Sequence, residues 1–178
     1  MTGFKYPLET NTRRRGVISS LRCYFERRND IMLLIGTTNT ATQAVAAGDT
    51  INLGATYRRY CKKNSAGTPA FTNTGTALSL NHSGIYHVTG TFVAAGTAAG
   101  VVTVGLSING VAVPYAFASE TITTAGTELR TLVIDDYVLV DSACVLGTTS
   151  TTPAVLSFTN TGVAATFSQV TVNAEKVV

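Results

Sequence analysis

The 178-residue chain is poor in charge and has no long apolar segment. Charged residues make up 13% of the sequence, about half of what is usual for a soluble domain, which suggests that part of the surface is covered in an assembly. No stretch reaches the roughly 18 apolar residues of a membrane span, and the N-terminus lacks the apolar core of a Sec signal. We therefore expect neither a membrane partner nor export by the general secretory route.

Cysteine is scarce as well. The three cysteines, Cys23, Cys61 and Cys144, are an odd number at wide separations, and no C-x-x-C pair occurs. This spacing argues against both a disulfide framework and a structural zinc site. Free, buried thiols are the expected state.

The net charge of +3 is unevenly distributed along the chain. Residues 1–31 contain seven basic and three acidic side chains, so residues 32–178 carry a net charge of −1. The folded body therefore lacks the clustered basic face that phosphate binding needs, and we expect no nucleic-acid partner. Its one local basic cluster is interpreted as a solvated face; it consists of Arg58, Arg59, Lys62 and Lys63.

Residues that carry catalysis in other proteins do not converge in this sequence. His82 and His87 have no cysteine or carboxylate at metal-ligand spacing, and the chain has neither a G-x-S-x-G elbow nor a phosphate loop. We expect no enzyme activity, no catalytic residue, no metal and no cofactor.

Asp135-Asp136 is the only acidic doublet. It would suit a cation at a trimer apex or in a loop, but adjacent strand positions point to opposite faces. We favour a solvated bend that separates a strand at Leu129–Ile134 from one at Tyr137–Val140.

The sequence has one strong turn signal, Asn109-Gly110, between two alternating apolar runs, Val102–Ile108 and Val111–Val113. Asn-Gly is typical of a type I′ hairpin turn, in which both central residues have positive φ. The predicted pairs are Ile108 with Val111, Leu106 with Val113 and Ser107 with Ala112. The four apolar members of these pairs, Leu106, Ile108, Val111 and Val113, are predicted to build the core.

Similar alternation runs through the rest of the body. Between Ile85 and Ala94, Tyr86 and Phe92 share one face with Val88, while His87 lies on the other. Tyr57 and Tyr60, among basic residues, are expected to cover a sheet edge. About ten short strands are predicted, with no substantial helix in the body; this is an all-β antiparallel sandwich or jelly roll.

The first 31 residues differ from the body, which we place at residues 32–178. They are basic and do not alternate, and Val17–Arg28 has the spacing of a short helix. One hypothesis is an arm that attaches the domain to a larger particle through Arg13, Arg14 and Arg15. The other is that Glu26–Met32 back-translates to a ribosome-binding site and a start codon, so that residues 1–31 are not part of the native protein.

Three segments carry a resemblance to a known family: Ser83–Phe92, Ser107–Pro114 and Val170–Val177. Together they resemble the C1q/TNF-like jelly roll, in the bacterial and phage version similar to the C-terminal domain of the exosporium protein BclA. This resemblance implies a compact homotrimer, which would bury low-charge surface around a threefold axis. It places Tyr86, Phe92, Val170 and Val172 in the core or at that axis.

The chain lacks the Gly-X-Y stalk and the exosporium leader of BclA-type proteins. We therefore expect a non-enzymatic adhesion or structural protein on a virion surface, as a phage head fibre or capsid decoration protein. Its partners would be further copies of itself and, through its N-terminus, the capsid. The alternatives are a spore-surface or secreted C1q-like module, and a lectin-like module that binds glycan between the loops Ala95–Gly100 and Thr148–Pro153.

Overall fold

The computed structural model describes residues 33–60, 67–140 and 153–177. These residues form eleven strands and no helix, and all strand pairs are antiparallel. The strands are β1 (Leu34–Asn39), β2 (Gln43–Val45), β3 (Ala55–Tyr60), β4 (Phe71–Asn73), β5 (Leu78–Leu80), β6 (Gly84–Gly96), β7 (Gly100–Ile108), β8 (Val111–Ile122), β9 (Leu129–Val140), β10 (Ala154–Asn160) and β11 (Ala165–Lys176). The predicted all-β class is confirmed, although four strands are longer than expected, at 12 or 13 residues.

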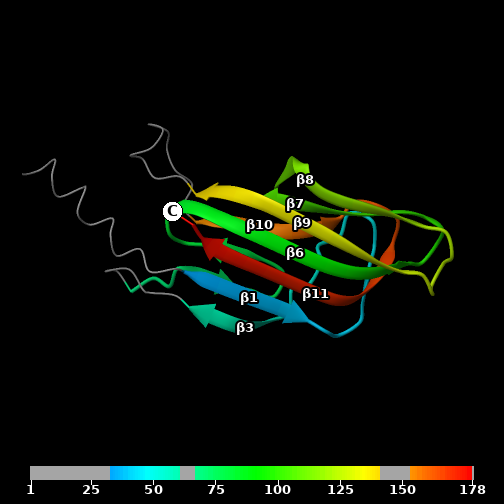
Figure 1. Cartoon of the computed structure of the whole chain (residues 1–178), viewed down its shortest axis with the longest axis horizontal. Coiled ribbons are helices and arrows are strands. Elements are labelled where there is room, and N and C mark those ends of the chain that lie inside the picture. The colour runs from blue at the N-terminus through cyan, green and yellow to red at the C-terminus, as the bar shows by residue number, and fades with distance from the viewer. Residues whose placement is uncertain (1–32, 61–66, 141–152, 178) are drawn as a thin grey trace, which may run out of the picture. The chain divides into compact units, whose positions relative to one another are not determined.

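The strands form two sheets. Sheet A has the order β3-β1-β11-β6-β9, with β2 paired to β11, and sheet B has the order β4-β5-β10-β7-β8. The first and last strands of the described chain therefore lie side by side in sheet A, as Figure 1 shows for β1 in blue and β11 in red. The edge strands are β3 and β9 in sheet A, and β4 and β8 in sheet B.

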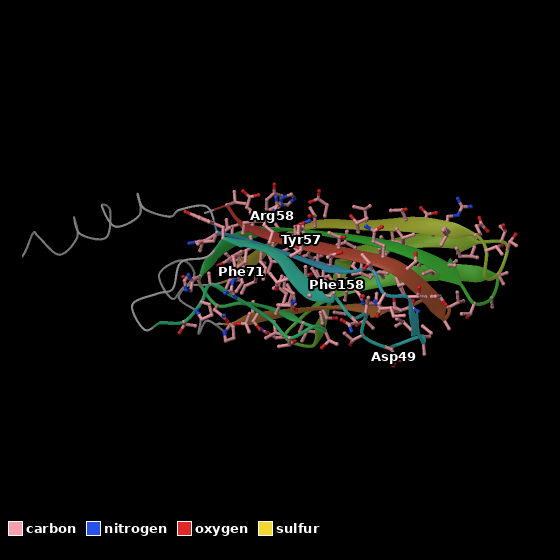
Figure 2. The ribbon with its side chains drawn as sticks, turned by 90° about the horizontal axis from the view of Figure 1, so that it is seen from below. Asp49, Tyr57, Arg58, Phe71 and Phe158 are labelled. Carbon is pink, nitrogen blue, oxygen red and sulfur yellow. The ribbon has the colours of Figure 1, made fainter. Side chains whose placement is uncertain are left out.

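A single hydrophobic core fills the space between the sheets. Strand β6 shows how the sequence builds it, because buried and partly exposed residues alternate from Tyr86 to Ala94 as predicted. Aromatic rings meet edge-on or tilted in this core: Phe71 and Tyr86 have centroids 5.8 Å apart, and those of Phe92 and Phe158 are 5.1 Å apart. Figure 2 shows Phe71 and Phe158 between the two layers.

The Asn109-Gly110 hairpin joins β7 to β8. Its central residues have φ values of 53° and 78°, as a type I′ turn requires, and the predicted pairs Ser107–Ala112 and Ile108–Val111 are confirmed. The predicted pairing of Leu106 with Val113 is wrong, because the register shifts between Gly105 and Ser107. Between these pairs, residues 113–116 of β8 lie opposite Leu106 alone, and Pro114, which has no N–H to donate to a partner strand, is among them.

The predicted break at Asp135-Asp136 is also wrong. Strand β9 is continuous from Leu129 to Val140, and its partner β6 pairs with every residue of it. Both carboxylates are accommodated in a regular strand because β9 is an edge strand, where charged side chains can reach water and discourage further strand addition.

Gly162 in the tight β10–β11 connection leads to a stability prediction. A Cβ atom there would lie 2.3 Å from the Val101 carbonyl oxygen and 2.5 Å from the Thr103 nitrogen, which are backbone atoms that cannot move aside. Gly162→Ala is expected to destabilise the fold by about 3 kcal/mol or more, measured by urea unfolding. Gly105→Ala is the control, since its nearest heavy atom would be 3.8 Å away; equal losses in the two variants would contradict this explanation.

Candidate self-association surface

Most of the core residues predicted from the sequence do lie in the core of the single chain. Five are completely buried, namely Tyr86, Phe92, Leu106, Val170 and Val172. Ile108 and Val113 are partly buried and pack against them. Any surface that meets another molecule must therefore consist of other side chains.

Val111 does not lie in the core, contrary to the sequence prediction. It is 71% exposed, because it follows the hairpin turn on β8, which is the edge strand of sheet B. Alternation correctly predicted that Val111 shares a face with its partner Ile108. It did not show that β8 ends the sheet.

Exposed apolar side chains gather on the outer face of β9 and the neighbouring part of β6. In β9 the inward apolar residues are buried, whereas Val133, Tyr137 and Leu139 point outward with 48–62% of their surface exposed. Ile85 of β6 pairs directly with Leu139. We call this surface the β9 strip; it consists of Ile85, Leu129, Val133, Tyr137 and Leu139.

The sequence analysis missed this strip, although a signal exists. The outward positions of β9 are almost as apolar as the inward ones, and a strand that is apolar on both faces normally has both faces covered. In the single chain only the inner face is covered.

The middle of the same outer face is polar but almost uncharged. Thr38 of β1 and Thr171 of β11 are cross-strand partners whose hydroxyl oxygens lie 3.5 Å apart. Toward the β3 edge, the hydroxyl of Tyr57 donates to Asn173 Oδ1 at 2.8 Å. The ring of Tyr57 lies over Gly36, where a Cβ atom would come within 2.7 Å of it. A surface with so few charges suits contact with another protein surface.

One ionisable cluster lies within the β9 strip. Nε2 of His87 is 2.5 Å from Oδ1 of Asp135, and the His87 ring stacks on Tyr137 with centroids 4.9 Å apart and planes at 26°. An exposed polar contact of this kind contributes at most about 1 kcal/mol. The cluster therefore acts mainly by fixing the Tyr137 ring against the sheet.

Asp135 and Asp136 point to opposite faces, so they do not converge on a cation. Oδ1 of Asp136 accepts a hydrogen bond from the Tyr137 backbone N–H at 2.8 Å. In the described ranges, no three His, Cys, Asp or Glu side chains are grouped so that they could hold a metal ion.

The remaining sequence predictions fall partly outside the described residues. Outside them lie Arg13, Arg14 and Arg15, the three cysteines, Lys62 and Lys63, and nearly all of the loop Thr148–Pro153. The proposed glycan loop Ala95–Gly100 is shorter than expected, because its first two residues end β6 and its last begins β7. Among the described residues, no helix is long and apolar enough to span a membrane.

Among the described residues, the one carboxyl with a strongly shifted pKa, Glu128, lies in the loop between β8 and β9. Glu128 Oε2 accepts hydrogen bonds from the Thr123 N–H and hydroxyl and from the Thr124 N–H, at 2.7–2.9 Å. Arg130 also donates to its carboxylate. The hydrogen bond from the Thr124 backbone contributes most to lowering the pKa of Glu128 from 4.5 to about 2.

This depressed pKa predicts how the loop responds to acid. Because the folded-state pKa is lowered, Glu128 stabilises the fold above pH 4.5, and this contribution is lost as the pH falls from about 4.5 to about 2. The difference in unfolding free energy between the wild type and Glu128→Gln should shrink over this range, as measured by urea unfolding at several pH values. A difference that stays constant down to pH 2 would contradict it.

Sequence comparisons find no match for the chain, either among family models or among curated proteins. Solved structures do match it. Eiger TNF from S. frugiperda has a TM-score of 0.55 at 8% identity, with 83% of this chain and 92% of that chain covered. Murine APRIL at pH 5.0 has a TM-score of 0.53 at 6% identity, covering 83% and 100%. The globular domain of zebrafish complement 1qA has a TM-score of 0.51 at 6% identity, covering 82% and 98%.

The chain therefore has the C1q/TNF-like jelly-roll fold, as its sequence predicted. These structural matches establish the fold, and at identities of 6–8% they establish nothing more. The finer similarity to BclA stays a prediction.

Proposed function

We propose that the chain is a non-enzymatic structural protein that assembles as a homotrimer and buries the β9 strip between copies. The observation that carries this proposal is the strip itself: large apolar side chains exposed side by side on one face of an edge strand. The centres of protein interfaces are apolar, rich in aromatic residues and poor in charge. Three copies is the number that the resemblance to the C1q/TNF-like family implies.

The absence of catalytic function is part of the proposal. Of the two histidines, His87 is paired with Asp135 on an exposed sheet face. His82 lies in the turn before β6, where its carbonyl accepts a hydrogen bond from the Tyr86 hydroxyl at 2.7 Å. Among the described residues, no serine, threonine or cysteine side chain is hydrogen-bonded to either histidine, as activation of a nucleophile by a general base would require.

We propose further that the trimer is displayed on a particle surface, as a phage head fibre or capsid decoration protein, with residues 1–31 as the attachment arm. In support, the two ends of the described chain lie together: the Lys176 N–H donates to the Leu33 carbonyl at 2.8 Å. An arm before Leu33 would thus leave the domain at one end of the sandwich. A spore-surface or secreted module is the alternative.

Gene context and particle composition test whether the protein is displayed on a virion surface. Flanking capsid and portal genes, and detection of the chain in purified particles by mass spectrometry, would support a virion protein. Flanking sporulation genes would support the alternative. Glycan binding is less favoured because the described loop at residues 97–99 is short, and a glycan array without binders would count against it.

A further inference from the structure

The two edges of sheet A carry charges of opposite sign. Arg58 and Arg59 lie on β3 at one edge, and Asp135 and Asp136 lie on β9 at the other. In both strands the two charges are adjacent, so each edge directs one charged side chain to each face of the sheet. Arg58 pairs with Gly36 and Asp135 with Thr89, which places both on the outer face.

The basic edge is fully accessible. All six residues of β3 are exposed, and among the described residues no ion pair includes Arg58 or Arg59. The guanidinium carbon of Arg58 lies 5.7 Å from the centroid of the Tyr57 ring, and Figure 2 shows the two side chains together beside β3. This cation–π contact keeps the charge beside an aromatic surface.

The acidic edge has a matching composition. Asp135 is 61% exposed and lies beside the β9 strip, so aromatic and charged groups are adjacent there as well. Arg130, the basic residue of β9, binds Glu128 in the preceding loop. Asp135 contacts Nε2 of His87 on β6 at 2.5 Å, whereas Asp136 has no ion-pair partner among the described residues.

A ring of identical chains joins one surface of each copy to a different surface of the next. Contacts between two β3 edges or between two β9 edges would bring like charges together, which costs several kcal/mol, whereas a β9 edge against a β3 edge brings opposite charges together. In such a ring the charges would select the orientation, and the apolar strip would supply most of the affinity.

We propose that β9 of one copy faces β3 of the next, with Asp135 and Asp136 opposite Arg58 and Arg59 of that next copy. The proposal rests on the self-association proposed above. A different role for these charges would be protection of exposed edges against aggregation, and that role predicts no effect of charge reversal on assembly.

Charge reversal on one edge, on the other and on both separates these possibilities. The first variant carries Arg58→Glu and Arg59→Glu, the second Asp135→Lys and Asp136→Lys, and the third all four changes. Sedimentation velocity of the full chain should show at least tenfold weaker association for each of the first two variants. The third should recover to within about threefold of the wild type, because its edges are again complementary.

Two controls keep the result interpretable. Circular dichroism checks that each variant is folded. Asp49→Lys with Glu120→Lys raises the net charge by the same amount as Asp135→Lys with Asp136→Lys, at positions outside β3 and β9. Folded single-edge variants that associate like the wild type would overturn the proposal. So would a variant with all four substitutions that associates no more tightly than the single-edge variants. A wild-type chain that stays monomeric at every concentration would instead refute the self-association itself.

Discussion

Val133→Glu combined with Tyr137→Glu is expected to convert the proposed trimer into a monomer. Both side chains are more than half exposed in the single chain, so the change should leave the fold intact. In the assembly, each copy would have to bury two carboxylates in an apolar contact, and desolvating unpaired charge is costly. We expect association to weaken at least a thousandfold, which is about 4 kcal/mol.

Sedimentation velocity over a hundredfold concentration range measures this effect. Val101→Glu with Tyr115→Glu is the matched control, because it makes the same two chemical changes at exposed positions on sheet B. The control should remain associated. A strip variant that is folded yet still trimeric, or a control that dissociates equally, would show that the β9 strip is not the contact surface.

Phe158→Ala is expected to lower the unfolding free energy by about 3–5 kcal/mol. Phe158 is completely buried between the sheets and packs on Phe92 with centroids 5.1 Å apart. Truncation removes these contacts and leaves a cavity that the long strands on either side cannot close. Urea unfolding at one fixed protein concentration measures the loss, since the stability of an assembly depends on concentration.

Phe117→Ala is the control for the buried truncation. It removes the same atoms from a side chain that is 57% exposed on β8, where a surface change usually costs less than about 0.5 kcal/mol. If both variants lost the same stability, the placement of Phe158 in the core would be wrong.

The sequence was sufficient to predict the features of this fold that depend on neighbouring residues. Asn-Gly predicted the hairpin turn and its two closing pairs, and alternation predicted which residues of β6 are buried. Both features depend on near neighbours, namely the φ values that a turn needs and the two-residue repeat of a strand.

Features that depend on distant partners were not predictable in the same way. The register shift opposite Leu106 lies on the edge strand β8, in the stretch that contains Pro114. The Asp135-Asp136 pair stays in a strand because β6 supplies a continuous partner. Val111 is exposed because sheet B ends at β8. Each outcome follows from which strand lies alongside, and a single strand's sequence does not contain that information.

The candidate self-association surface was not predicted from the sequence for the same reason, because it depends on which strands lie side by side. Apolar residues at the outward positions of β9 show that both faces favour burial, but not what covers the second face. Tyr57 reaches Asn173 across a sheet whose strand order had to be known first. Composition alone led to the same proposal, because a weakly charged chain is expected to hide part of its surface in an assembly.

Sedimentation equilibrium of the full chain tests the central claim, self-association through the β9 strip, most directly. The wild type and the Val133→Glu, Tyr137→Glu variant would be measured at the same concentrations. We predict a mass of three times 18.6 kDa for the wild type and 18.6 kDa for the variant. A wild-type mass of 18.6 kDa throughout the micromolar range would contradict the account.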